Sequence, residues 1–300
     1  MQKLIVSGAD TGYFDLVQDL VTSIRRTPDT AEFAIAIIDG GLTDEQRHAL
    51  AARDVIVSPP HVPEFAPRRA LEKRPNLAIN FSKPWLNRLF PDAGTILWLD
   101  GDTWVQDPTA LAVLFAAAGR GHLSVVPEAG QYWSDQVPLR WIFPGYAQIR
   151  SFLYKSGRHA RLPYSVLRNI AAKATLNAGV FALEGTAPHW AAMQAWQRVL
   201  LRRGKPFTAD QMALSLSIYE DRLPVNLLSQ RFNYMMGPWR VKADSQELVE
   251  YYYPYAPVGI VHLADQKKCR LDTWHKVEMP DTDGRMRAVR LRYCAPGERL

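Results

Sequence analysis

The chain has 300 residues, of which 47% are hydrophobic and 22% charged, and its formal net charge is +6. This composition is ordinary for a globular protein and excludes a wholly disordered, collagen-like or coiled-coil chain. Two cysteines, Cys269 and Cys294, are too few for a disulfide framework or a cysteine-rich zinc site, so we expect a reducing cytoplasm as the location. The apolar run before Asp10 is too short for a signal peptide, and no run reaches the ~20 apolar residues of a membrane span.

Positive charge gathers in one segment, between residues 138 and 173. Removing its seven basic residues from the 36 in the chain leaves 29, against 30 acidic residues. The segment also carries six aromatic residues, so it can face an anionic acceptor, a membrane surface or nucleic acid, or form a solvated surface. No nucleic-acid motif accompanies it, and we expect no nucleic-acid binding. The basic residues are Arg140, Arg150, Lys155, Arg158, Arg161, Arg168 and Lys173.

The first third of the chain alternates strand and helix patterns. Such alternation predicts an α/β fold with a central, mostly parallel mixed sheet flanked by helices, in which ligands bind beyond the carboxyl ends of the strands. The expected strands are Lys3–Ser7, Phe33–Ile38, Val55–Ser58 and Thr95–Leu99; the expected helices are Tyr13–Arg25, Thr43–Arg53 and Asn80–Phe90, the last broken at Pro84, with a loop from Pro59 to Pro75.

The remainder of the chain is less regular. We expect residues 127–173 to form an irregular basic, aromatic insertion and residues 265–300 to form a C-terminal tail. No linker divides the chain, so residues 1–300 are expected to form a single domain. The other expected elements are helices Thr109–Ala118, His189–Arg203 and Asp210–Glu220 and strands Leu123–Val126, Asn177–Leu183, Val225–Leu228 and Gly259–Leu263.

The segment TILWLDGDTWV carries the clearest chemical signal. Asp100 and Asp102, separated by Gly101, follow a buried strand and can aim two carboxylates into one crevice. Oxygen ligands of this kind suit Mg²⁺ or Mn²⁺, which often complete their shell with phosphate oxygens. Asp-Gly is also ordinary turn chemistry. The motif therefore indicates either a metal site or a turn.

Around this motif the sequence resembles glycosyltransferase family 8, which includes glycogenin-like enzymes and lipopolysaccharide hexosyltransferases. Five segments occur in the family's order and span about residues 4 to 268. The resemblance implies a GT-A, Rossmann-like fold. The segments are Ser7-x-x-Asp10-x-x-Tyr13, the run from Lys83 through Leu97-Trp98-Leu99-Asp100-Gly101-Asp102, Asn177-Ala178-Gly179-Val180-Phe181, Asp210-Gln211, and Val261-His262-Leu263-Ala264.

The resemblance implies that Asp100, Asp102 and His262 bind Mn²⁺ or Mg²⁺, and Mn²⁺ tolerates this mixed set of oxygen and nitrogen ligands better. Taken in isolation, a histidine at a strand end is more often a core residue than a metal ligand, and the ordered series of segments favours the ligand. Lys83 and Lys268 would stabilise charge on the departing diphosphate, although surface lysines are common. The chain has Asp265 and Lys268-Cys269-Arg270 where the family has Gly and Lys-Pro-Trp, so that loop can be reshaped.

The resemblance also implies a nucleotide-sugar site. Asp10 and Tyr13, after Ser7, would hold the base; Asn177, Asp210 and Gln211 would surround the sugar, and the small Ala178 and Gly179 would permit its close approach. Packing of a helix by Tyr13, a strand bulge at Gly179 and helix capping by Asp210 are the plain alternatives.

The resemblance implies a metal-dependent, retaining hexosyltransferase that uses a nucleotide sugar, with UDP-hexose as the expected donor. We expect front-face transfer with Asp210 or Gln211 near the anomeric carbon; a covalent intermediate stays open. One alternative is a sugar nucleotidyltransferase, which would need a basic, glycine-rich loop that Ser7-Gly8-Ala9-Asp10 does not provide. Another is a non-catalytic nucleotide-sugar or glycan-binding protein.

The acceptor expected from the basic segment is an anionic glycan or a lipid-linked molecule, and a protein acceptor stays open. Arginines favour phosphate and carboxylate groups, and aromatic faces stack on sugar rings. We therefore expect peripheral association with the inner face of a membrane. The oligomeric state is not predicted.

Overall fold

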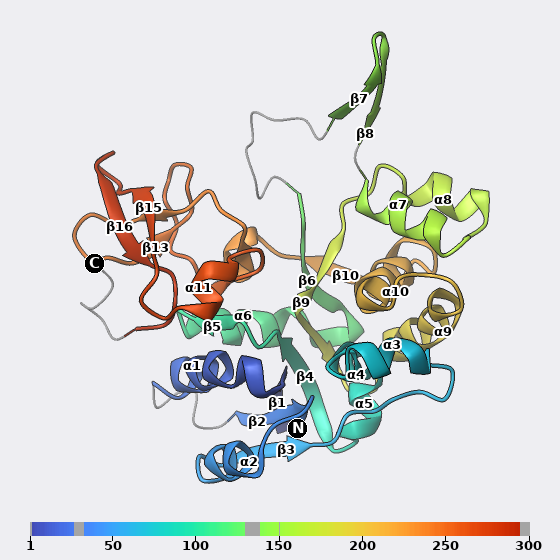
Figure 1. Cartoon of the computed structure of the whole chain (residues 1–300), viewed down its shortest axis with the longest axis horizontal. Coiled ribbons are helices and arrows are strands. Elements are labelled where there is room, and N and C mark those ends of the chain that lie inside the picture. The colour runs from blue at the N-terminus through green and yellow to red at the C-terminus, as the bar shows by residue number, and fades with distance from the viewer. Residues whose placement is uncertain (1, 27–32, 130–138, 150, 295–300) are drawn as a thin grey trace.

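Figure 1 shows a computed structural model that describes residues 2–26, 33–129, 139–149 and 151–294. Its central sheet has seven strands in the order β10-β6-β9-β4-β1-β2-β3. Only β9 runs antiparallel to its neighbours, which confirms the expected mostly parallel mixed sheet. The strands are β1 (Gln2–Ala9), β2 (Ala34–Asp39), β3 (Val55–Ser58), β4 (Ala93–Leu99), β6 (Leu123–Pro127), β9 (Leu176–Glu184) and β10 (Val225–Leu227).

Helices cover both faces of this sheet, because successive strand residues point to opposite faces. In β4, Ile96 and Trp98 face one core, and Leu97 and Leu99 face the other. The second core lies under α1 (Phe14–Arg25), α2 (Asp44–Ala51) and α6 (Thr109–Ala117). The first lies under α3 (Arg68–Lys73), α4 (Leu77–Ser82), α5 (Leu86–Leu89), α9 (His189–Leu201) and α10 (Ala209–Tyr219).

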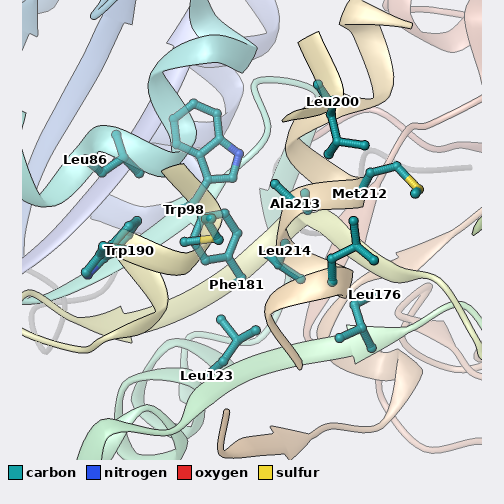
Figure 2. Packing of buried hydrophobic residues seen from close by; sticks show 14 of the residues in the cluster. Leu86, Trp98, Leu123, Leu176, Phe181, Trp190, Leu200, Met212, Ala213 and Leu214 are labelled. Atoms are coloured by element: carbon teal, nitrogen blue, oxygen red, sulfur yellow. The ribbon is translucent and has the colours of Figure 1, made fainter. Parts of the chain in front are cut away.

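Large aromatic side chains fill the core between the sheet and α9. Figure 2 shows Trp98 of β4, Phe181 of β9 and Trp190 of α9 among leucines from α9 and α10. The rings of Phe181 and Trp190 lie 6.3 Å apart, centroid to centroid. Burying one such side chain contributes about 1.5–3 kcal/mol. Because Trp98 faces this core two residues before Asp100, the packing fixes the strand end that carries the acidic motif.

A short 3₁₀ turn, η3 (Lys83–Trp85), joins α4 to α5. The break expected at Pro84 is therefore confirmed, since proline has no backbone N–H to continue the helix. Two side chains of α9 hold the turn: Gln194 Nε2 donates to the carbonyl of Pro84 (2.9 Å), and Gln197 Oε1 accepts from Trp85 Nε1 (2.8 Å). The position of Lys83 is thus set by helix packing on both sides of the turn.

A second, three-stranded sheet extends the acidic motif. It has the order β11-β14-β5 and comprises β5 (Thr103–Val105), β11 (Tyr234–Met235) and β14 (Ile260–His262). Antiparallel pairing of β5 with β14 places Thr103 opposite His262. This pairing brings His262 beside the motif, although 160 residues separate His262 from Asp102 in the sequence.

The C-terminal segment corrects one expectation. It is not a tail up to residue 294, because it forms α11 (Lys267–Leu271) and a hairpin, β15 (Lys276–Pro280) and β16 (Met286–Arg290). Met279 and Val289 of that hairpin pack into a third core with Trp104. The short strands β12 (Arg240–Val241) and β13 (Leu248–Val249) pair beside it; residues 295–300 lie outside the described part.

The basic segment is also more regular than expected. It contains a hairpin, β7 (Leu139–Phe143) and β8 (Tyr146–Ile149), which projects from the body of the molecule, and two helices, α7 (Phe152–His159) and α8 (Tyr164–Ile170) (Figure 1). Leu153 and Ile170 join the main core, so burial of apolar residues orders these helices. Residues 130–138 and 150, which include Arg150, are not described. The loop expected from Pro59 to Pro75 likewise contains α3.

None of the helices among the described residues has the length and apolar character of a transmembrane span.

Candidate metal and donor site

A cavity of about 430 Å³ opens where β1 and β4 end. Its lining includes Asp10, Lys83, Asp100, Asp102 and His262. These residues come from four segments that lie far apart in the sequence. The position agrees with the rule that ligands of such sheets bind beyond the carboxyl ends of the strands.

Asp100, Asp102 and His262 each offer one ligand atom, and these three atoms lie within 4.8 Å of one another. His262 Nε2 is 3.3 Å from Asp102 Oδ1 and 3.9 Å from Asp100 Oδ2. Burial alone would raise the pKa of Asp102, but His262 and Arg270 lower it to about 2. Two carboxylates and an imidazole in this arrangement can bind one divalent cation.

A chain of hydrogen bonds fixes the orientation of the imidazole. The Gly179 N–H donates to Asn177 Oδ1 (2.8 Å), and Asn233 Nδ2 donates to the same oxygen (2.8 Å). Asn233 Oδ1, 2.8 Å from His262 Nδ1, must therefore accept a hydrogen bond from the N–H at that nitrogen. With Nδ1 protonated, Nε2 is the nitrogen that faces the two carboxylates. Burial would lower the pKa of His262, but Asp102 and Asp100 raise it, so Nε2 would bind a cation by exchanging a proton for the metal.

Lys83 joins the metal motif to α10. Its Nζ lies 2.8 Å from Asp100 Oδ1 and 3.1 Å from Asp210 Oδ2, and it donates to the carbonyl of Ala178 (3.2 Å). Burial would lower the pKa of Lys83, but the two carboxylates raise it. Asp210 does not cap α10, whose N-cap is Thr208. Its carboxylate is buried against the Lys83 ammonium instead.

Two glycines allow the backbone to approach closely. A Cβ on Gly179 would lie 2.5 Å from His262 Cε1 and 2.9 Å from Asp100 Oδ2. A Cβ on Gly101 would lie 2.6 Å from the carbonyl oxygen of Gly8, at the end of β1. Real Cβ atoms essentially never come this close, so only glycine fits either position. Gly101 thus serves close packing of the motif against β1.

Arg270 of α11 supplies a positive charge next to Asp102 in the cavity. Its Nη1 lies 3.0 Å from Asp102 Oδ2 and donates to the Tyr13 hydroxyl (2.8 Å). Lys268 is exposed and does not line the cavity. The side chain of this helix that lines the cavity is therefore Arg270, two positions after the lysine expected from the sequence.

Of the three residues expected near the nucleotide base, two line the cavity and one does not. Asp10 and Tyr13 line the cavity, whereas Ser7 is fully buried within β1. Asp10 Oδ1 accepts from the Tyr13 N–H (3.0 Å), and Oδ2 accepts from Asn76 Nδ2 (3.1 Å). The carboxylate of Asp10 thus fixes the turn that presents the Tyr13 ring.

Glu128 adds a carboxylate that the sequence reading missed. Its Oε1 accepts from Asn177 Nδ2 (2.7 Å) and from Gln211 Nε2 (3.2 Å), and burial raises its pKa. These three side chains line one part of the cavity, while Ala178 and Gly179 lie in the strand behind them. The sequence did contain a signal for Glu128 as a site residue, because Glu128 directly follows strand β6 just as Asp100 follows β4. Asn233, by contrast, has no motif around it.

Three solved structures with a similar fold are glycosyltransferases. The galactosyltransferase LgtC, in complex with donor and acceptor sugar analogues, has a TM-score of 0.51 and 14% identity, covering 87% of this chain and 86% of its own. For mouse xyloside xylosyltransferase 1 the TM-score is 0.50 at 12% identity, with 87% and 96% covered. The bifunctional glycosyltransferase WbbM matches at 0.53 and 13% identity over 88% of this chain and 46% of its own.

No family model and no curated protein matches the sequence. At these identities the likeness shows the fold, and the chain has the GT-A fold of glycosyltransferases.

Proposed function

We propose that the chain is a metal-dependent glycosyltransferase, similar to family 8, that moves a hexose from a UDP-sugar to an acceptor hydroxyl with retention of configuration. The observation that carries the proposal is the cluster of Asp100, Asp102 and His262 in the cavity at the carboxyl ends of the strands. The fold supports it, and so do the five family-like segments, most of whose polar residues meet at this cavity.

The donor atoms fit a divalent cation, Mn²⁺ or Mg²⁺. Asn233 accepts from Nδ1 of His262, so Nε2 is the nitrogen that would bind the cation in place of a proton, and the carboxylates of Asp100 and Asp102 face it. When bound, the cation would neutralise charge on the nucleoside diphosphate as it leaves.

The cationic side chains around the cavity support departure of a diphosphate. Lys83 and Arg270 carry positive charge on two sides of the acidic cluster, at Asp100 and Asp102 respectively. Positive groups fixed before the reaction stabilise negative charge that develops on the leaving oxygen. The Tyr13 ring, held by Asp10, would stack on the base.

The sugar would lie between β9 and α10. Asn177, Gln211 and Glu128 present polar groups there, and Asp210 orients Lys83 from behind. The carboxylate of Glu128 can accept a hydroxyl proton or hold a sugar hydroxyl. We favour front-face transfer, in which the departing diphosphate oxygen helps to take the proton of the acceptor hydroxyl.

The acceptor side of the proposal rests on α7 and α8. Arg158 of α7 and Arg161, in the turn between the two helices, are exposed, and both suit an anionic glycan or a lipid-linked acceptor at a membrane surface. Charge reversal at these two arginines should raise the acceptor KM without changing UDP affinity. Unchanged acceptor kinetics would remove this part of the proposal and leave the donor part standing.

The test of the whole proposal is a screen of nucleotide sugars for slow hydrolysis in the presence of Mn²⁺. We expect release of UDP from one donor, its abolition in Asp102→Asn, and wild-type release from Asp92→Asn, whose carboxylate is exposed near the start of β4. Synthesis of a nucleotide sugar from a nucleoside triphosphate and a sugar phosphate would show a nucleotidyltransferase instead. Binding of UDP without turnover of any donor or acceptor would indicate a non-catalytic binding protein.

A further inference from the structure

A second cavity, of about 480 Å³, lies beside η3 and shares no lining residue with the first. Trp85, two residues after Lys83, contributes to its wall together with His61 and Phe65. Arg88 of α5 and Arg198 of α9 also line it. A cavity of this size lies within the range of about 300–1,000 Å³ typical of small-molecule sites.

Aromatic rings hold both guanidinium groups in place. The Arg88 guanidinium carbon lies 4.8 Å from the centroid of the Trp85 ring, and that of Arg198 lies 4.6 Å from the Phe65 ring. The Phe65 and Trp85 rings are themselves 6.5 Å apart. Cation–π contacts of this kind position an arginine while its N–H groups remain able to donate.

The two arginines have no partner for those donors within the described part of the chain. The contacts that the structure shows for Arg88 and Arg198 are the two ring contacts above, and both residues are exposed. Glu64 also lines the cavity; it is exposed too, and its carboxylate forms no ion pair with a described residue. Two arginines and one glutamate give the lining a net charge of +1.

His61 adds a third polar group. Its ring stacks on Trp85 with centroids 4.5 Å apart. Burial and the nearby Arg88 lower its pKa, so the imidazole is neutral at pH 7 and can donate one N–H. Two planar guanidinium groups and one imidazole N–H match the three oxygens of a phosphate monoester better than the two of a carboxylate.

We propose that this second cavity binds the phosphate group of a small phosphorylated molecule, with Arg88 and Arg198 as its main donors and His61 as a third. The inference goes beyond the proposed glycosyl transfer and does not depend on it.

Indole ¹⁵N–¹H spectra can follow the two cavities separately in the whole protein. The Trp85 indole N–H bonds to Gln197 beside the second cavity, and that of Trp98 bonds to Asp100 in the first. Titration with inorganic phosphate, in the presence of a chelator, should shift the Trp85 signal along a saturable curve. We expect the dissociation constant to rise at least tenfold in Arg88→Gln/Arg198→Gln.

The matched control is Arg202→Gln/Arg203→Gln, which removes two exposed positive charges at the end of the same helix, outside both cavities. It should leave the Trp85 titration unchanged, and an unshifted Trp98 signal in each phosphate-free variant verifies folding. The proposal would be overturned if the Trp85 signal did not shift with phosphate, or if the dissociation constant for phosphate rose equally in both double variants. Tighter binding of glucuronate than of phosphate would overturn the phosphate assignment.

Discussion

Asn233 and His262 meet across 2.8 Å, with the amide oxygen of the first accepting from Nδ1 of the second. Both side chains are buried, so neither can exchange this partner for water. The contact makes Asn233 a positioning residue for the metal ligand, one step removed from the cation itself.

Replacing Asn233 with Ala should therefore weaken Mn²⁺ binding about 10- to 100-fold, because the imidazole loses the group that fixes its tautomer and orientation. Calorimetric titration with Mn²⁺ measures the change. Asn169→Ala is the control: this asparagine also makes two hydrogen bonds, but on α8 and outside the cavity. Equal Mn²⁺ affinity in both variants would contradict the positioning role.

Gly179→Ala should disturb the same site by crowding. The added methyl group would meet His262, Asn177 and Asp100 at 2.5 to 2.9 Å, so these side chains must move apart. We expect a loss of stability of about 1–3 kcal/mol and weaker Mn²⁺ binding, measured by urea unfolding and calorimetry. Gly119→Ala, where a Cβ would have no neighbour within 4 Å, should change neither quantity.

Substitutions of Arg270 and of Lys268 should affect donor binding differently. Arg270→Gln removes a guanidinium that lies inside the cavity and should weaken UDP binding in Mn²⁺ about tenfold or more. Lys268→Gln removes an exposed charge on the same helix and should leave UDP affinity nearly unchanged. The reverse order would restore Lys268 to the role that the family resemblance implies.

Glu128 should make stability depend on pH. Burial raises its pKa in the folded protein above the ordinary value of 4.5, so the folded state binds this proton more tightly than the unfolded state does. Stability therefore falls as pH rises from 4.5 through the folded pKa, and the loss is complete above it. Glu128→Gln should be more stable than the wild type at pH 7, and the difference should disappear below pH 4.5.

Urea unfolding at several pH values checks this prediction. Glu72→Gln, on the exposed side of α3, is the matched control and should show no such pH-dependent difference. A Glu128→Gln variant that is less stable than the wild type at pH 7 would mean that the ionised carboxylate stabilises the fold through Asn177 and Gln211.

Local sequence signals predicted the main sheet well. The helix expected from Thr43 begins there, with Thr43 and Gln46 forming a capping box at its start, and strand Val55–Ser58 has the expected bounds. These features depend on residues close in sequence. The short strand β5 was missed because its pairing partner, β14, lies about 155 residues later.

The candidate site was predictable where a motif marks it. Asp100 and Asp102 follow a buried strand, and their meeting with His262 could be expected from the family resemblance. Asn233 and Arg270 could not, because their roles arise from the packing of β11, β14 and α11. The two helices of the basic segment were missed because, at eight and seven residues, they are too short for an apolar period to stand out.

The turn η3 is only three residues long, yet its first residue contacts the acidic cluster and its last forms a wall of the second cavity. The Lys83 ammonium and the Trp85 indole thus leave the same short segment of backbone toward different cavities. A displacement of the η3 backbone would act on both cavities, whereas a rotation of one side chain need not. Gln194 and Gln197 of α9 hold this backbone segment in place.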